Sequence, residues 1–364
     1  MRYISTRGGT SSLSFSDVLV GALARDGGLF MPETWPQDTG AINARGYTAT
    51  ALQVATLFAR ECFSAAELEQ DIKSAYASFD GPDIAPLVEL EAGLYLLELF
   101  HGPTLAFKDI AMQLLARLMS RELGRRNARA TILVATSGDT GSAAIAAFGG
   151  LPQFDVFVLY PKGRVSDVQR RQMTTSAYEN VHNIALEGTF DDTQALVKVL
   201  FGDKEFAAAH ALTAVNSINF VRIIAQSVYY FTATAKLGRA ARFVVPTGNF
   251  GDIFAGEAAA RMGLAIAGLV AATNANDILV RALNEGIYTA HDARATLSPS
   301  MDIQVASNFE RGLFEASDRN HHWLTEAMTD FARTQELVIP AATLTALQKR
   351  YHAESISDDE TLQT

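Results

Sequence analysis

The chain has 364 residues, 48% of them hydrophobic and 19% charged, and a formal net charge of −10 at pH 7. This length predicts two or three domains, and the negative charge argues against nucleic acid or an anionic membrane as partner. The single cysteine, Cys62, excludes an intrachain disulfide and fits a reducing compartment. The first residues carry no apolar run, so we expect no signal peptide, no membrane span and a cytoplasmic location.

The N-terminal region, residues 1–95, is predicted to be mainly helical. Apolar residues recur at helical spacing over residues 15–23 and 51–62, and the glycine-rich stretch 26–32 between them predicts a turn. Residues 87–99 are apolar with interspersed acids, which favours one or two short strands. We therefore expect helices joined by short irregular links, with one or two short strands at the end of this region.

From residue 96 onward the pattern alternates between strands and helices, and we divide it into α/β domains at 96–235 and 236–364. Strands are predicted at 131–135, 156–160, 181–186, 242–246 and 267–272, and helices at 142–148, 166–174, 192–201, 220–237 and 277–284. Repeated strand–helix units indicate two open, mostly parallel sheets flanked by helices, with ligands bound at the carboxyl ends of the strands. The predicted fold class is α/β.

A lysine stands at the start of an apolar helix in the first of these domains. Gly102 and Pro103 predict a turn, after which Thr104 is expected to cap a helix that has Lys108 in its first turn. Burial and the helix dipole both disfavour the ammonium form there. A partly neutral amine suits Schiff-base chemistry with an aldehyde or ketone, whereas a lysine whose head reaches water would have no such role.

Two loops, 137–141 and 248–252, each join the end of a predicted strand to the start of a helix. Glycine lets backbone N–H groups turn toward a ligand, and a helix N-terminus favours a negative group. Neither loop matches the phosphate loop of NTPases or the dinucleotide fingerprint, and either alone also fits a tight turn formed for packing. Together with Lys108, the loops suggest an aldehyde cofactor that carries a phosphate and a substrate that carries a carboxylate.

A local basic cluster follows the predicted strand 156–160. Lys162 and Arg164 come directly after the strand, and we expect them to contact the substrate because arginine suits a doubly charged phosphate. Arg170 and Arg171 fit a solvated helix face equally well, and Arg222 follows the stretch 216–219. The histidines have no metal-ligand spacing, so no metal site is expected.

Three motifs stand out together in this order: His101-Gly102-Pro103-Thr104-Leu105-Ala106-Phe107-Lys108-Asp109, Thr136-Ser137-Gly138-Asp139-Thr140-Gly141-Ser142-Ala143-Ala144 and Pro246-Thr247-Gly248-Asn249-Phe250-Gly251-Asp252. Together they resemble threonine synthase, a pyridoxal-phosphate (PLP) enzyme of fold type II, in its longer-chain branch. Further similarity lies in the stretches 26–30, 160–166, 216–219 and 297–302. The resemblance runs from the first residues to the last.

The resemblance implies a role for each matching residue. Lys108 would be the catalytic residue, which holds PLP as a Schiff base and shuttles protons. The other cofactor-binding residues would be Gly248, Asn249, Phe250, Gly251 and Asp252 around the PLP phosphate, together with Asp139. The substrate-binding residues would be Ser137, Gly138, Thr140, Lys162, Arg164 and Asn216.

The family converts O-phospho-L-homoserine and water to L-threonine and phosphate, the last step of threonine biosynthesis. PLP acts as an electron sink for carbanions at Cα and then Cβ, phosphate leaves from Cγ, and water adds at Cβ. The expected partner is this small molecule, and the sequence does not predict an oligomeric state. A PLP-dependent lyase of the same fold, such as a phospholyase or a threonine dehydratase, is the alternative, because elimination and replacement share their early steps.

The end of the chain predicts a further element. Ser357 and Glu360 form a capping box, which announces a helix, yet only residues 361–364 follow. Members of the family continue into an Ala-Thr-Ala-His-Pro-type stretch whose threonine lies near the pyridine nitrogen of PLP. We therefore expect that a C-terminal part is missing, and an inactive, truncated PLP-binding protein is the third interpretation.

Overall fold

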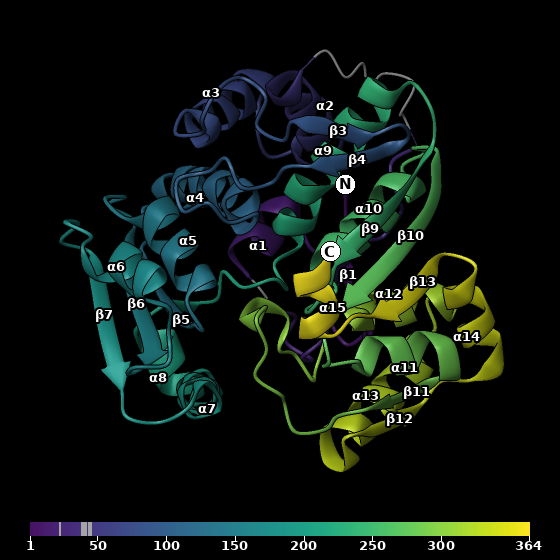
Figure 1. The fold of residues 1–364 in the computed structure, drawn as a ribbon. Helices are drawn as coiled ribbons and strands as arrows, with labels where there is room; N and C mark the ends of the chain where they lie inside the picture. Colours follow the sequence, from purple (N-terminus) through teal and green to yellow (C-terminus); the bar gives the residue numbers. More distant parts are fainter. Residues whose placement is uncertain (22, 38–41, 43–45) are drawn as a thin grey trace. The chain divides into compact units, whose positions relative to one another are not determined.

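The computed structural model describes residues 1–21, 23–37, 42 and 46–364 (Figure 1). The contacts between residues divide the chain into two compact units. Unit 1 consists of Met1–Val18, Leu23–Asn43 and Gln226–Thr364, and unit 2 consists of Leu19–Ala22 and Ala44–Ala225. The long helix α9 (Phe220–Leu237) begins in unit 2 and continues in unit 1. Among the described residues, no helix combines the length and apolar composition that crossing a bilayer requires.

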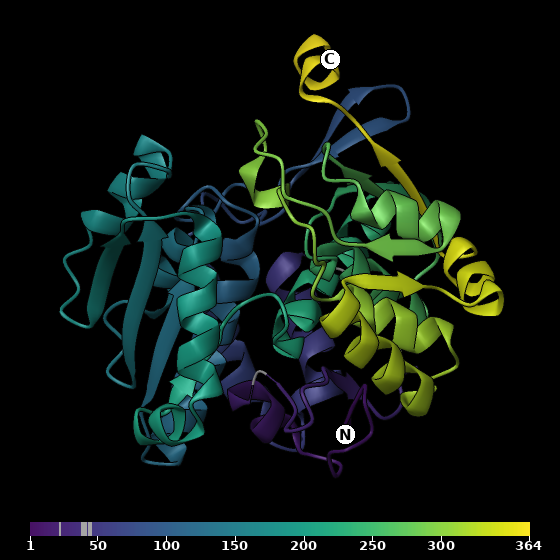
Figure 2. The ribbon, with the colours of Figure 1, turned by 90° about the horizontal axis from the view of Figure 1, so that it is seen from below.

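Unit 2 is built on a parallel sheet with the strand order β7-β6-β5-β8. Its strands are β5 (Ala130–Ala135), β6 (Phe154–Pro161), β7 (Val181–Leu186) and β8 (Leu212–Thr213). The teal strands β5, β6 and β7 lie side by side in both views (Figures 1 and 2). Residues of β5 and β6 are mostly buried, as the continuous apolar runs of a parallel sheet require.

The helices of unit 2 pack on this sheet and on one another. Helices α5 and α7 contact β5 and β6, α4 packs on α5, and α3 packs on α4. The helices are α2 (Tyr47–Ala59), α3 (Ala65–Tyr76), α4 (Lys108–Arg125), α5 (Asp139–Phe148), α6 (Asp167–Thr174), α7 (Phe190–Gly202) and α8 (Lys204–Ala209). A hairpin of β3 (Leu87–Glu91) and β4 (Leu94–Leu97) precedes α4, at the place where short strands were expected.

Unit 1 contains a second parallel sheet, with the strand order β13-β10-β9. Its strands are β9 (Ala241–Pro246), β10 (Ile266–Thr273) and β13 (Tyr351–Ser355). Antiparallel pairs are formed by β1 (Tyr3–Ser5) with β2 (Phe30–Pro32) and by β11 (Ile287–Thr289) with β12 (Glu336–Val338). The helices are α10 (Gly251–Arg261), α11 (Ile278–Glu285), the short 3₁₀ helix η2 (Pro299–Met301), α12 (Phe309–Ala316), α13 (His321–Thr334), α14 (Ala341–Gln348) and α15 (Asp358–Gln363). Helix α1 (Phe15–Val20) divides between the two units.

The predicted fold class is confirmed: two open parallel sheets are flanked by helices. The capping box at Ser357 also begins a helix, α15. The turn predicted over 26–32 is wrong in its last part, because Phe30–Pro32 pairs with Tyr3–Ser5 as β2. The domain boundaries at residues 95 and 235 remain a prediction, and the contacts distribute the first 95 residues over both units.

Candidate active site

Lys108 is the first residue of α4, and the loop before it wraps around the next residue, Asp109. The buried Asp109 carboxylate accepts hydrogen bonds from the N–H (2.8 Å) and the hydroxyl (2.7 Å) of Thr104. Gly102 approaches so closely that a Cβ there would lie 2.5 Å from the Cβ of Asp109. The prediction that Thr104 caps the helix is therefore wrong: Phe107 holds the cap position, and Thr104 binds Asp109 instead. Lys108 nevertheless lies in the first turn, as predicted.

The side chain of Lys108 is 12% exposed, and its ammonium group donates a hydrogen bond to the Asp139 carboxylate. Burial lowers the pKa of Lys108 below its ordinary value, and the positive charge of Arg222 lowers this pKa further, while Asp139 opposes both. The direction is the one predicted from the sequence. Because burial is the largest cause, Lys108 reaches the neutral, nucleophilic form more readily than a surface lysine does.

The loop between β5 and α5 places Asp139 beside Lys108. The Thr136 hydroxyl oxygen accepts hydrogen bonds from the N–H groups of Gly138 and Gly141, both at 2.9 Å. Gly138 has a φ of 142°, a conformation that side chains disfavour, and this turn leads directly into α5. The helix begins at Asp139, three residues before its predicted start at residue 142, so Asp139 and Thr140 belong to its first turn.

Asp139 divides its two carboxylate oxygens between the loop and the lysine. One oxygen accepts a hydrogen bond from the N–H of Thr140 (2.7 Å), and the other accepts the hydrogen bond from Lys108. Ser137 and Thr140 are half-buried next to Asp139 in the chain. Of the predicted site residues in unit 2, the structure thus brings together Lys108 and the 137–140 loop.

Three predicted substrate residues lie on the surface of unit 2. Lys162 forms an ion pair with Glu187 at 2.6 Å. The pKa of Asp192 is lowered mainly by hydrogen bonds from Thr189, and the positive charge of Arg164 lowers it a little further. Asn216 is also exposed. Among the described residues, none of these three predicted side chains forms a hydrogen bond with Lys108 or with the 137–140 loop.

Arg222, one of the cations that the sequence offered for the substrate phosphate, has an electrostatic effect on Lys108. It is 2% exposed, donates a hydrogen bond to the carbonyl of Val215 (3.3 Å), and acts electrostatically on Lys108. Arg222 affects the pKa of Lys108 because it lies in the buried part of α9. In the sequence, only the apolar character of this helix indicated that the arginine would be buried. A second positive charge near the lysine favours negatively charged ligands in this part of unit 2.

In unit 1, the loop 248–252 joins β9 to α10. Phe250 holds the cap position of α10 with a φ of 63°, a left-handed conformation that is uncommon for a residue other than glycine. Its side chain is 1% exposed and packs on the rings of Phe309 and Tyr351, with centroid distances of 5.2 and 5.0 Å. This packing stabilises a backbone turn that ends at the N-terminus of α10, where N–H groups have no intrahelical partner and suit a phosphate.

Residues 300–308 fix the first half of the same loop. The carbonyl of Asn249 accepts a hydrogen bond from the N–H of Asn308, and its side-chain oxygen accepts one from the hydroxyl of Ser307, both at 2.9 Å. A Cβ at Gly248 would lie 3.0 Å from Ile303 and 3.1 Å from the carbonyl oxygen of Ser300. A side chain at position 248 would therefore displace these neighbours by a few tenths of an ångström.

The carboxylate of Asp252, the last residue of the loop, accepts hydrogen bonds from two neighbouring tyrosines of α9. The Tyr229 hydroxyl donates to Oδ1, and the Tyr230 hydroxyl donates to the same oxygen at 3.1 Å. Burial raises the pKa of Asp252 from 3.8 to about 6, although both tyrosines act to lower it. The two tyrosines carried no motif in the sequence.

Asp252→Asn is expected to increase the free energy of unfolding, relative to the original chain, more at pH 7.5 than at pH 4.5. The pKa of Asp252 is about 6 in the folded state and 3.8 without the fold, so the protonated carboxyl group favours folding. This contribution to stability is complete below the unfolded pKa and is lost as the pH rises through about 6. The neutral amide removes that loss and still accepts from Tyr229 and Tyr230. Urea unfolding without added cofactor measures the difference, with the exposed Asp359→Asn as control. An equal difference at about pH 4.5 and about pH 7.5 would contradict the raised pKa.

Separate features of unit 2 and of unit 1 each fit one group of PLP. In unit 2, Lys108 is largely shielded from solvent, with a lowered pKa and beside a carboxylate, which suits an aldehyde. In unit 1, the closely packed Gly248 and the left-handed Phe250 lead into a helix N-terminus, which suits a phosphate group such as that of PLP.

Comparisons with known proteins agree with this interpretation. Residues 2–76 match the family model described as "Threonine synthase N terminus", and residues 81–362 match that of "Pyridoxal-phosphate dependent enzyme". The chain is 46% identical to threonine synthase of Pseudomonas aeruginosa, with 100% of this chain and 79% of the relative covered.

Two solved structures resemble the chain over nearly its whole length. For PLP-bound threonine synthase from Brucella melitensis, the TM-score is 0.95 at 50% identity, and 99% of this chain and 79% of that chain are covered. For threonine synthase from yeast, the TM-score is 0.92 at 40% identity, with 100% and 78% covered. The chain thus spans about four fifths of the length of these relatives.

Proposed function

We propose roles for the site residues from the premise that this chain belongs to the threonine synthase family of pyridoxal-phosphate-dependent enzymes. Its activity is the conversion of O-phospho-L-homoserine and water to L-threonine and phosphate, and its cofactor is PLP. It is therefore a carbon–oxygen lyase that acts on a phosphate ester. The observation that carries the residue assignment is the partly buried contact between Lys108 and Asp139.

Lys108 is the catalytic residue of this proposal. Bound PLP supplies an electron sink for the carbanions that the reaction requires at Cα and Cβ. The lowered pKa lets the Lys108 amine be neutral, so that it can hold the aldehyde of the cofactor and accept a proton from the substrate Cα. Asp139 orients Nζ through its hydrogen bond, and its negative charge stabilises the protonated amine when Lys108 donates a proton.

The loops bind the anionic groups. Residues 248–252 would hold the PLP phosphate through the backbone N–H groups at the start of α10. Ser137, Gly138 and Thr140 would bind the substrate carboxylate at the start of α5, with Asp139 toward the cofactor.

The predicted phosphate ligands Lys162 and Arg164 remain part of the proposal, as does Asn216. Lys162 would exchange its exposed ion pair with Glu187 for the substrate phosphate, an exchange of low cost because exposed ion pairs contribute little stability.

The predicted cytoplasmic location and the expected absence of nucleic-acid and membrane partners likewise remain predictions.

Product analysis tests the proposal against its alternatives. The chain, supplied with PLP and O-phospho-L-homoserine, is expected to form threonine and phosphate in equal amounts, and reactions without PLP serve as control. A 2-oxo acid in place of threonine would assign the chain to the eliminating lyases. Binding of PLP without any product would support the inactive PLP-binding interpretation.

A further inference from the structure

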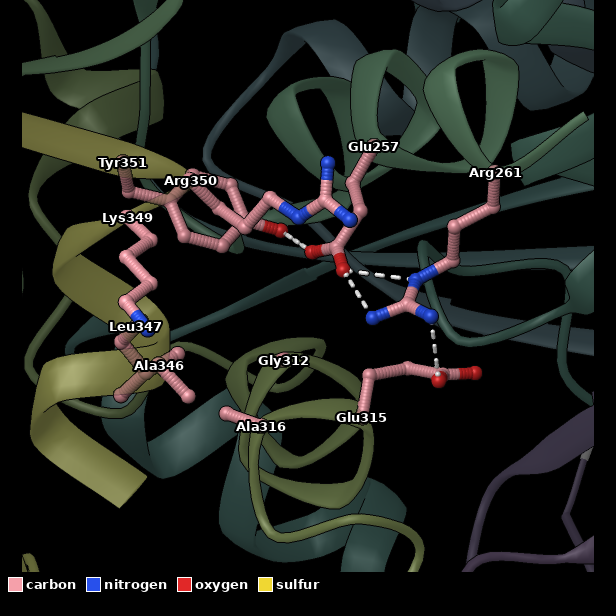
Figure 3. A pocket seen from close by; sticks show the side chains of 10 residues that line it. All are labelled: Glu257, Arg261, Gly312, Glu315, Ala316, Ala346, Leu347, Lys349, Arg350 and Tyr351. Atoms are coloured by element: carbon pink, nitrogen blue, oxygen red, sulfur yellow. Dashed lines mark hydrogen bonds and ion pairs between the residues drawn. The ribbon is translucent and has the colours of Figure 1, made fainter. Parts of the chain in front are cut away.

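Unit 1 contains a pocket of about 230 Å³, and half of its lining residues are charged (Figure 3). It lies among α10, α12, α14 and the start of β13. Since one water molecule occupies about 30 Å³ of liquid, the volume is sufficient for a small organic or inorganic ion. The polar residues of the lining are Glu257, Arg261, Glu315, Lys349, Arg350 and Tyr351.

The two carboxylates of the pocket already have partners. Glu257 is 2% exposed; one of its oxygens accepts from Arg261 at 2.7 Å, and the other accepts the hydroxyl of Tyr351. Glu315 forms an ion pair with Arg261 at 2.8 Å. It also accepts hydrogen bonds from Trp35 and Arg319. Neither acid therefore requires a cationic ligand.

Two cations of the pocket lack such partners. Lys349 and Arg350 are consecutive residues between α14 and β13, and neither side chain forms a hydrogen bond or an ion pair with a described residue. Figure 3 shows the guanidinium group of Arg350 over Glu257, on whose charge it acts. With Arg261, the lining carries three positive charges against two negative ones, in a chain of net charge −10. The lining therefore has a local excess of positive charge that an anion would neutralise.

The pocket also shares its wall with the loop 248–252. The ring of Tyr351 packs on Phe250, and a Cβ at Gly312 would lie 3.1 Å from the same phenylalanine ring. Glu257 and Arg261 belong to α10, the helix that Phe250 caps. A ligand that moves Tyr351 or α10 would therefore act on the left-handed turn at Phe250.

We propose that this pocket binds a small anion with a carboxylate or phosphoryl group, held by Arg350 and Lys349, and that its occupancy changes the affinity for PLP through Phe250. The coupling rests on the proposed function of the 248–252 loop, whereas the binding itself does not. Coupling between two sites is reciprocal, so PLP must change the affinity for the anion by the same factor.

Calorimetric titration with malonate and with inorganic phosphate tests the binding. The double variant Lys349→Ala/Arg350→Ala is expected to weaken binding of at least one probe by about tenfold or more, since two charged contacts are lost. The control Lys198→Ala/Arg239→Ala removes the same charge from exposed positions outside the pocket and should bind like the original chain. Loss of malonate binding alone identifies a carboxylate site, and loss of phosphate binding alone identifies a phosphoryl site. Absence of binding, or equal affinity in the pocket variant, overturns the proposal.

Absorbance titration with PLP, with and without the saturating probe, tests the coupling. We expect the probe to change the PLP affinity of the original chain and of the control variant. The PLP affinity of the pocket variant should be the same with and without the probe. Equal PLP affinity with and without the probe overturns the coupling and leaves the anion site. A chain that binds the probe and no PLP at all overturns the proposed function, and the coupling with it.

Discussion

Replacing Lys108 with alanine is expected to lower the rate of threonine formation by about 10⁴-fold or more. A positioned acid–base group contributes up to about that factor, and the amine that holds the cofactor aldehyde is lost as well. Lys108→Arg should be inactive too, because a guanidinium group keeps the charge beside Asp139 but does not deprotonate in proteins. Steady-state assays of threonine and phosphate measure both variants.

Lys73→Ala is the matched control for this experiment. Lys73 is a 68% exposed lysine of α3 whose ion pair with Glu69 is of the helical i,i+4 kind. Its loss should change stability by no more than about 0.5 kcal/mol and leave activity intact. A folded Lys108→Ala variant, shown by a cooperative thermal transition, that still forms threonine at a similar rate would refute the catalytic assignment.

Gly138→Ala is expected to lower activity by about 100-fold, because small displacements in a catalytic site have effects of that size. The backbone of Gly138 has a φ of 142°, so any side chain there is strained by about 1–3 kcal/mol. The added Cβ would also overlap the side-chain amide of Gln169, whose oxygen accepts a hydrogen bond from the Ser166 hydroxyl at 3.2 Å. Relaxation of this strain would displace the next residue, Asp139, from Lys108. Assays of kcat and KM, together with urea unfolding, measure the two effects.

Gly93→Ala separates strain from function. Gly93 lies in the β3–β4 turn with a φ of 86°, and an added Cβ would meet no atom within 4 Å. This control should lose stability and keep its activity. If Gly138→Ala instead kept both kcat and KM, the 137–140 loop would have no role in positioning Asp139.

The parallel sheets were predictable because their local signals are strong. The strand at 181–186 and the helix at 220–237 appear with the predicted bounds, since each is a single run of one period with turn residues at its ends. The pair of β1 and β2 was not predictable in the same way. Its strands have only three residues each, and the partners come from distant parts of the chain, so no local pattern reveals the pairing.

The candidate site could be predicted where a functional group lies at the start of a helix or in a glycine-containing loop, because the sequence shows both features locally. The position of Lys108 in the first turn of α4 gave the direction of its pKa shift, because burial and helix start are local properties. The Thr104 prediction failed because a buried carboxylate, Asp109, competes for the same hydroxyl. Arg222 and the two tyrosines at Asp252 act across distances in the sequence that no motif spans.

The origin of the oxygen atoms in the products tests the central assignment most directly. The reaction is run in water enriched in ¹⁸O, with PLP and O-phospho-L-homoserine, and both products are analysed by mass spectrometry. A lyase that breaks the Cγ–O bond and adds water at Cβ predicts label in the threonine hydroxyl and none in the released phosphate. Label in the phosphate, with an unlabelled amino acid, would show that the P–O bond breaks and would contradict the account.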